Sequence, residues 1–336
     1  MSDMENAMVR SEASATAGPA LPDVLPAVAP DSVPDHELIE PRKAHRSFST
    51  VIAPYLFVLP AFLIVFVFVV VAALNTFRLA FTNSTLLRPG KFVAFDNFAA
   101  IIHDDYFWTA MLNSSLYVVC VVPFMVILPL VLANLVRGNS RIMGFFRTSF
   151  YTPVVMSAVV VGMIWTNLLD SKGLVNSLLQ TMHVIAKPIP FLTDRWLILF
   201  SAMFVTIWLG LGYYMVIYLT ALANIDKSLY EAAQLDGAGP ARQFIYITMP
   251  GVRSTMMLIM MLSTIAAFRV FNEIYVLTNG TAGPGGEDIT MSMLIQQQGT
   301  GIQARTGYAS ALSLIVLAVV GTLLVVQQLV QKRGED

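Results

Sequence analysis

The chain has 336 residues, of which 56% are hydrophobic and 12% are charged, and its formal net charge is −1. Its mean hydropathy of +0.69 lies far above that of soluble domains, in which about a quarter of the residues are charged. These values exclude an ordinary soluble domain and predict an all-α integral membrane protein. The basic residues form no patch interleaved with aromatic side chains, so nucleic acid is not an expected partner.

The first 46 residues differ in composition from the rest of the chain. They are rich in alanine, proline, serine and acidic residues and show no apolar periodicity. Such a segment buries too little apolar surface to offset the entropy lost on ordering, so we predict that residues 1–46 are a disordered tail. Near Met1 no basic stretch precedes an apolar one, which argues against a secretory signal.

Apolar runs long enough to cross a bilayer follow this tail. A hydrocarbon core of about 30 Å requires about 20 apolar residues in a helix, and five uncharged runs meet this requirement: 47–77, 106–136, 148–169, 196–225 and 306–331. A sixth run, between Arg253 and Arg269, spans about 22 Å as a helix, so we expect it to carry Arg269 and Glu273 into the outer part of the bilayer. The sequence thus predicts six transmembrane helices in residues 47–331 and a short tail at 332–336.

Prolines and a glycine interrupt two of these runs. Pro123 and Pro129 lie in the second run, and Gly162 lies in the third. Prolines in membrane helices are tolerated where neighbouring helices or water satisfy the freed carbonyl groups. They are either hinges of an alternating-access motion or fixed kinks, and both interpretations stay open.

The fourth run contains the sequence Trp-Leu-Gly-Leu-Gly-Tyr-Tyr-Met at 208–215. Gly210 and Gly212 allow backbones to approach each other, while Tyr213 and Tyr214 each combine a flat apolar face with a hydroxyl group. That combination suits a sugar ring, which has an apolar face and a rim of hydroxyl groups. Alternatively, the glycines serve close helix packing alone and the tyrosines mark an interface.

A polar segment at 226–250 interrupts the apolar chain and predicts a short helix. Ser228 followed by Glu231 fits a capping box, so we expect the helix to start at Ser228. Gly237 suits a left-handed C-terminal cap and Pro240 can open the next helix, so the first helix should end near Asp236. Two helical turns are marginal in water, which indicates that a partner packs against the side containing Ala232, Ala233 and Leu235.

The same segment resembles the EAA loop of the membrane subunits of bacterial ABC importers. The matching positions are Glu231, Ala232, Ala233, Asp236, Gly237, Ala238, Phe244, Ile247 and Pro250, whereas Met249 replaces a usual leucine and Ser254 a frequent proline. The resemblance implies the type I ABC importer permease fold with a short cytoplasmic coupling helix, which inserts into a cleft of an ATPase. The coupling residues that it implies are Glu231, Ala232, Ala233, Asp236, Gly237 and Ala238.

Other segments after Val51 resemble carbohydrate permeases of the maltose, trehalose and glycerol-phosphate type. They include Phe-Thr-Asn at 81–83, Phe-Asp-Asn-Phe at 95–98, and the segments 149–179 and 307–321. In the maltose-type permeases the Trp-x-Gly-x-x-Tyr region contributes to the sugar pocket, and a polar pocket position matches Ser263. Ala266, Ala267 and Val270 stand where the maltose-type permease has larger or polar groups, which leaves the identity of the sugar open. The pathway candidates are therefore Leu209, Gly210, Tyr213 and Ser263, with Phe271, Asn272 and Tyr275 at the exit of the fifth span.

Arg269 and Glu273 are four residues apart and would be neighbours on one face of a helix. Such an intramembrane pair could orient a ligand, including an anionic one. We favour the alternative that the pair is a structural lock that neutralises its own charge.

The resemblance also implies partners and an orientation. It predicts a second homologous permease subunit, two copies of a cytoplasmic ABC ATPase that bind ATP and magnesium, and an extracytoplasmic substrate-binding protein. Lysine and arginine near the span ends favour cytoplasmic termini in a bacterial plasma membrane. Residues 226–250 then lie in the cytoplasm.

Several absences in the sequence narrow the function. There is no Gly-x-x-x-x-Gly-Lys-Ser/Thr loop for ATP, no Gly-x-Ser-x-Gly elbow, and no histidine or cysteine spacing typical of a metal site. We therefore predict a transport subunit without catalytic residues, cofactor or metal of its own. An autonomous secondary transporter or a membrane scaffold is the alternative, although neither internal repeats nor several intramembrane carboxylates support it.

Overall fold

The computed structural model describes residues 48–301 and 304–333, and the predicted tail at 1–46 and the last three residues of the chain lie outside them. The described residues form helices, with one isolated antiparallel bridge between Thr82 and Phe92. Six helical segments are long and apolar enough to cross a membrane: Tyr55–Ala80, Asp105–Val136, Ala158–Thr181, Arg195–Ala223, Arg253–Leu277 and Thr306–Arg333. The prediction of an all-α membrane protein with six spans is confirmed.

The first span is made of three consecutive helical elements. These are α2 (Phe48–Val65), the π-helical η2 (Phe66–Val71) and α3 (Ala72–Ala80). The chain divides by its contacts into a unit that ends at Leu63 and a larger unit that begins at Ile64. Within the larger unit, α3 packs against α16 (Thr306–Arg333).

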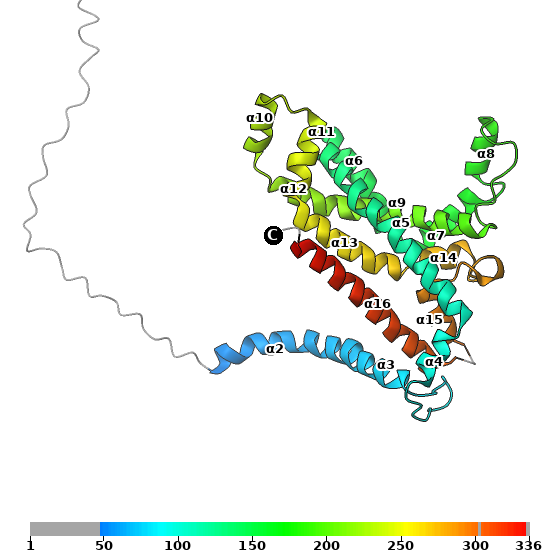
Figure 1. Cartoon of the computed structure of the whole chain (residues 1–336). Helices are drawn as coiled ribbons and strands as arrows, with labels where there is room; N and C mark the ends of the chain where they lie inside the picture. Colours follow the sequence, from blue (N-terminus) through cyan, green and yellow to red (C-terminus); the bar gives the residue numbers. More distant parts are fainter. Residues whose placement is uncertain (1–47, 302–303, 334–336) are drawn as a thin grey trace, which may run out of the picture. The chain divides into compact units, whose positions relative to one another are not determined.

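Three long helices form the centre of the larger unit. The second span, α5 (Asp105–Val136), packs along α9 (Arg195–Ala223) and α13 (Arg253–Phe268) (Figure 1). Tyr117 and Tyr218 are fully buried where these helices meet, and the Tyr218 hydroxyl donates a hydrogen bond to the Val126 carbonyl oxygen at 2.9 Å. The α5 helix continues through Pro123 and Pro129. The Val126 carbonyl oxygen, which accepts the hydrogen bond from Tyr218, lies between these two prolines in the sequence.

The third span does not coincide with the uncharged run at 148–169, because the long apolar helical segment is Ala158–Thr181 and the run itself is divided among several helical elements. The chain forms α6 (Arg141–Tyr151), a 3-10 segment η3 (Thr152–Val155), α7 (Ala158–Leu169) and then α8 (Leu174–Thr181). Met156 is extended, with φ −81° and ψ 147°. Pro153 lies in the first turn of η3 and has no amide hydrogen to donate, so it cannot contribute the hydrogen bond that would continue α6 as a regular α-helix.

The fifth span is also broken, and this corrects the expected pairing of Arg269 with Glu273. The helix α13 ends at Phe268, and α14 (Asn272–Leu277) begins after three non-helical residues. The helical spacing of four residues therefore does not apply across the break. Among the described residues no ion pair joins Arg269 to Glu273, so the predicted lock between them is wrong.

Outside residues 226–252, which include α12 (Met249–Gly251), the remaining elements are α4 (Asp96–Ile102), η5 (Pro284–Gly286) and α15 (Met291–Gly299). The α15 helix packs against α16 and α5. Arg195 at the first turn of α9 contacts Glu287 in the loop between α14 and α15, whereas α10 (Lys227–Leu235) follows the last turn of α9. Since a helix of 29 residues is about 43 Å long, these two regions lie at opposite ends of the bundle.

Candidate functional site

The first candidate site is α10, the helix predicted for the polar segment. Its N-cap is Asp226, whose side chain accepts a hydrogen bond from the Ser228 amide at 2.9 Å. This bond holds the pKa of Asp226 below its ordinary value, because it favours the ionised carboxylate. The expected capping box at Ser228 and Glu231 is therefore wrong by two residues, because an aspartate nearer the start of the helix already fills the cap position.

The end of α10 follows the prediction. Gly237 has a φ of +75°, and the Ala238 amide donates to the Ala233 carbonyl oxygen at 2.8 Å. These features are those of a Schellman cap, which serves the last carbonyl groups of a helix. Pro240 then opens α11 (Pro240–Gln243), as the sequence predicts.

Tyr230 fixes α10 to the membrane helices. Its side chain is buried, and its hydroxyl oxygen lies 2.9 Å from the Thr248 hydroxyl oxygen in the π-helical η4 (Phe244–Thr248). The Arg137 guanidinium at the end of α5 stands 4.4 Å from the centre of the Tyr230 ring. One side chain thus connects α10 to α5 and to η4, which precedes the fifth span, so a displacement of α10 would be transmitted to both.

The rest of α10 is open to a partner. Leu235 is 91% exposed and Leu229 is 53% exposed. Glu231, Ala232, Asp236 and Gly237 are also exposed, while Ala233 and Ala238 are half-buried. A short helix with exposed leucines and one anchored face is suited to docking against another protein.

A basic cavity adjoins the anchored face of α10. It has a volume of about 700 Å³, and its charged lining residues are Arg137, Arg147, Lys227 and Glu231. The Arg147 side chain donates to the carbonyl oxygens of Val136 and Gly138, both at 2.8 Å, and so caps the C-terminus of α5. Cations are favourable at this end of a helix, where the backbone dipoles leave partial negative charge.

The second candidate site is a cavity between α7 and α14, the helix after the break. It has a volume of about 570 Å³ and is lined by Val159, Met163, Thr166, Asn167, Phe271, Asn272, Tyr275, Val276 and Asn279. Three of the sequence candidates, Phe271, Asn272 and Tyr275, lie in this lining. The Phe271 and Tyr275 rings lie 5.1 Å apart at 31°, so the wall combines aromatic faces with amide side chains.

Sequence reasoning missed Thr166, Asn167 and Asn279 in the lining of this cavity. The Thr166 hydroxyl and the Asn167 amide nitrogen donate to carbonyl oxygens within α7, at 2.9 and 2.8 Å. The side-chain carbonyl oxygen of Asn167 takes part in neither bond and can accept a hydrogen bond from a ligand. A threonine and an asparagine in an apolar span are costly in lipid, and that signal could have identified them.

The other four pathway candidates, Leu209, Gly210, Tyr213 and Ser263, do not line the cavity. A methyl group at Gly210 would meet the Met125 side chain, and one at Gly212 would meet the Phe150 carbonyl oxygen. Ser263 is buried and donates within α13 to the Ile259 and Met260 carbonyl oxygens, at 2.7 and 3.1 Å. Tyr213 is 47% exposed and stacks edge-on against Tyr214.

The part of the chain that the structure describes contains no group of three or more His, Cys, Asp or Glu residues placed to hold a metal ion.

Known proteins resemble this chain over most of its length. It is 31% identical over 271 residues to the lactose transport system permease protein LacF of Rhizobium radiobacter, covering 80% of this chain and 90% of LacF. It is 33% identical over 292 residues to the probable ABC transporter permease protein YurN of Bacillus subtilis, covering 85% of this chain and 98% of YurN.

The fold is that of a solved structure, a bacterial alginate ABC transporter in complex with an alginate pentasaccharide-bound periplasmic protein. One chain of that structure matches with a TM-score of 0.73 at 22% identity, over 85% of this chain and 97% of that one. The family model of the binding-protein-dependent transport system inner membrane component matches residues 105–334, a range that includes α10 and the cavity between α7 and α14. The chain is a multi-pass membrane protein that belongs to this family of transport system inner membrane components.

Proposed function

We propose that this chain is the membrane-spanning permease subunit of an ATP-driven sugar importer, in which it forms half of the translocation pathway. The observation on which the proposal rests is α10, a capped helix that is anchored through Tyr230 and exposes Leu235 and the Glu-Ala-Ala positions. Family membership supports this role, because the family consists of binding-protein-dependent transport components and its relatives include a lactose transport system permease and a probable ABC transporter permease.

ATP hydrolysis belongs to a partner in this proposal. Two copies of a cytoplasmic ATPase carry ATP and magnesium, and one of them receives α10 of this chain. A second homologous permease subunit completes the pathway, and an extracytoplasmic binding protein delivers the cargo. The periplasmic protein in the alginate transporter complex supports the last of these partners.

The orientation follows from the same assignment. If α10 meets a cytoplasmic ATPase, the loop between α14 and α15 faces the outside of the plasma membrane, because it lies at the other end of α9. An even number of spans then places both termini in the cytoplasm. Arg137, Arg147 and Lys227 beside α10 agree with the excess of cationic residues typical of cytoplasmic loops.

A sugar is the cargo that best fits the cavity between α7 and α14. Phe271 and Tyr275 offer aromatic faces, and Asn167, Asn272 and Asn279 offer amide groups that can hydrogen-bond to hydroxyl groups. The permease LacF belongs to a lactose transport system, and the periplasmic protein in the solved alginate transporter complex binds an alginate pentasaccharide, which supports the same class of cargo.

Transport by the assembled complex in liposomes tests the proposal. The panel contains mono- and disaccharides, oligosaccharides, glycerol phosphates and amino acids, with and without ATP on the α10 side. We expect uptake of one or more saccharides that requires ATP and the ATPase. Uptake driven by an ion gradient without the ATPase would contradict the importer assignment, and exclusive uptake of amino acids would contradict the sugar assignment.

A further inference from the structure

The loop between α14 and α15 contains a buried acid that plays no part in the coupling helix or in the cargo cavity. Asp288 is fully buried, and neither of its carboxyl oxygens has a hydrogen-bond partner among the described residues. An ionised carboxylate in such a position is very costly, because it has lost water without gaining partners. A group in this situation takes up a proton and becomes neutral.

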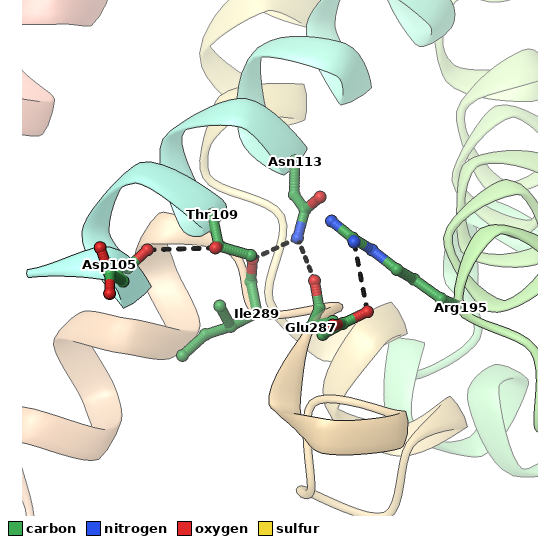
Figure 2. A network of polar contacts seen from close by, with 6 residues as sticks. All are labelled: Asp105, Thr109, Asn113, Arg195, Glu287 and Ile289. Atoms are coloured by element: carbon green, nitrogen blue, oxygen red, sulfur yellow. Dashed lines mark hydrogen bonds and ion pairs between the residues drawn. The ribbon is translucent and has the colours of Figure 1, made fainter.

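The backbone on both sides of Asp288 is fixed to α5. The Asn113 amide nitrogen donates to the Glu287 carbonyl oxygen at 2.7 Å and to the Ile289 carbonyl oxygen at 2.9 Å (Figure 2). The Asp288 amide donates to the Ala282 carbonyl oxygen at 2.8 Å and closes the loop on itself. Asp288 therefore cannot bring its side chain into water unless these bonds open.

The loop is also shaped around the carboxyl group. Gly283 has a φ of +74°, and a methyl group on its Cα would overlap the Asp288 Oδ2 atom. A glycine is thus required here both for the backbone conformation and for the space that the acid occupies. The acid and the glycine form one packed unit at the turn before α15.

Three charged residues surround this unit. Arg195 and Asp194 lie at the first turn of α9, and Glu287 lies in the loop itself. The Arg195 Nη1 atom is 3.2 Å from Glu287 Oε2, while its Nε atom is buried without a partner among the described residues (Figure 2). Of the elements packed around the loop, α5 contributes the neutral Asn113, and Tyr106 lies against Gly286.

These surroundings place the titration of Asp288 near neutrality. Burial is the largest cause and raises the pKa of Asp288, Arg195 lowers it, and Glu287 and Asp194 raise it, so that the pKa is about 7. Arg195 forms an ion pair with Glu287, so its charge is partly neutralised and stabilises the Asp288 carboxylate less than an unpaired arginine would.

We propose that Asp288 is a proton-binding site that holds the loop 282–290 against α5 and α9 when it is protonated and weakens this contact when the proton leaves. On deprotonation the carboxylate must either attract Arg195 away from Glu287 or reach water by opening the loop. The first response breaks the ion pair between Arg195 and Glu287, and the second breaks the hydrogen bonds that hold the loop to Asn113.

The site is connected to the wall of the cargo cavity. The Thr290 hydroxyl, two residues after Asp288, donates to the Val270 carbonyl oxygen at 3.0 Å in the helix break. Val270 precedes Phe271, which lines the cavity between α7 and α14. The protonation of Asp288 therefore affects how firmly the break before α14 is held.

The direction of the pH effect follows from the raised pKa. Between the ordinary value of 3.8 and about 7, the closed loop keeps a proton that the opened loop releases. Closure therefore weakens as the pH rises through this range and changes no further above it. Each unit of pKa shift corresponds to about a tenfold change in the opening equilibrium.

Infrared difference spectroscopy on the full-length chain in lipid nanodiscs measures the proton directly. We expect a carbonyl band of a protonated carboxylic acid that disappears with a midpoint near pH 7. We expect that this band is missing in Asp288→Asn and unchanged in Asp105→Asn, which removes an exposed carboxylate from the first turn of α5. The absence of such a band from the wild-type chain at low pH would overturn the proposal. This outcome requires the wild-type chain alone, so it applies even if Asp288→Asn fails to fold.

Hydrogen–deuterium exchange of residues 282–291 measures the loop. After correction for intrinsic exchange rates, we expect at least about tenfold faster opening at about pH 8 than at about pH 5 in the wild type, and little change in Asp288→Asn. Equal pH dependence in both chains would overturn the proposal. An ion pair of Asp288 with Arg195 that persisted across this pH range would do the same. Neither measurement involves cargo or ATP, so each is independent of the proposed transport function.

Discussion

The Tyr230 and Thr248 hydroxyl oxygens lie 2.9 Å apart in a buried contact that joins α10 to η4, the segment that leads into the fifth span. The Tyr230 ring also lies under the Arg137 guanidinium, which belongs to the end of α5. If α10 is the element that an ATPase moves, this contact is the path along which the movement enters the membrane helices. It therefore gives the first test of the coupling role.

We expect that Tyr230→Phe lowers the uptake rate about fivefold, because it keeps the ring under Arg137 and removes a hydrogen bond of about 1 kcal/mol. Thr248→Val should have a similar effect. The double variant should lose no more than either single one, since both remove the same bond. Uptake measured for this double-mutant cycle checks the prediction, and additive losses would show that the two residues act separately.

Two glycines near the end of α10 provide a matched pair of variants. Gly237 has a φ of +75° and Gly239 a φ of −70°, and a methyl group on either would meet nothing within 4 Å. We expect Gly237→Ala to cost about 1–2 kcal/mol of cap stability because of its left-handed conformation, and Gly239→Ala to cost little. ATP-dependent uptake and co-purification of the ATPase should therefore fall in the first variant alone. Equal behaviour of the two variants would argue against a role of this cap in coupling.

The cavity between α7 and α14 predicts which side chains contact cargo. Asn272→Ala and Asn167→Ala each remove a hydrogen-bonding group from its wall, so we expect losses of about 1–3 kcal/mol, or roughly 5- to 150-fold in transport. Leu258→Ala, at an exposed apolar position of α13, is the control and should transport at the wild-type rate. Tyr213→Ala separates the alternatives, because Tyr213 does not line the cavity. A larger loss for Tyr213→Ala than for either asparagine variant would place the cargo along α9 instead.

Gly212 provides a test of helix packing. A methyl group there would meet the Phe150 carbonyl oxygen and the Tyr151 Cα atom, so we expect Gly212→Ala to destabilise the protein by about 1–3 kcal/mol. Gly321→Ala on α16 places its methyl group in open space and should leave the stability unchanged or slightly higher. Thermal unfolding in detergent compares the two variants. A wild-type melting temperature for Gly212→Ala would mean that α9 and the segment before Met156 are not packed this closely.

The sequence predicts the number of spans because a bilayer requires long uncharged runs, and this requirement leaves few alternatives. It does not predict the breaks at Met156 and at Arg269–Phe271, because a run of uncharged residues does not show where its helix is interrupted. The pair Arg269 and Glu273 shows the consequence. Their spacing is that of helical neighbours, but the helix ends between them and no ion pair joins these two described residues.

The two candidate sites were predictable to different degrees, because one depends on neighbouring residues in the sequence and the other on residues that the fold brings together. The end of α10 follows from local chemistry, since Gly237 and Pro240 restrict the backbone by themselves. The cavity joins residues of α7 to residues about 105 to 120 positions later in the chain, and no local pattern contains such a relationship. Asp288 and Asn113 likewise come together through the fold, and their role could not be inferred from spacing.

Site-directed cross-linking at Leu235 tests the central claim most directly. Cys120 is the one cysteine of the chain, so Leu235→Cys in a Cys120→Ser background places a single thiol on the exposed face of α10. Met182→Cys is the control, because Met182 is 70% exposed and follows α8, on the side of α9 where Arg195 lies. With a bifunctional reagent and the assembled, transport-competent complex, we predict that the ATPase is cross-linked at position 235 and not at position 182. Cross-linking at position 182 alone, in a complex with wild-type uptake, would contradict the account.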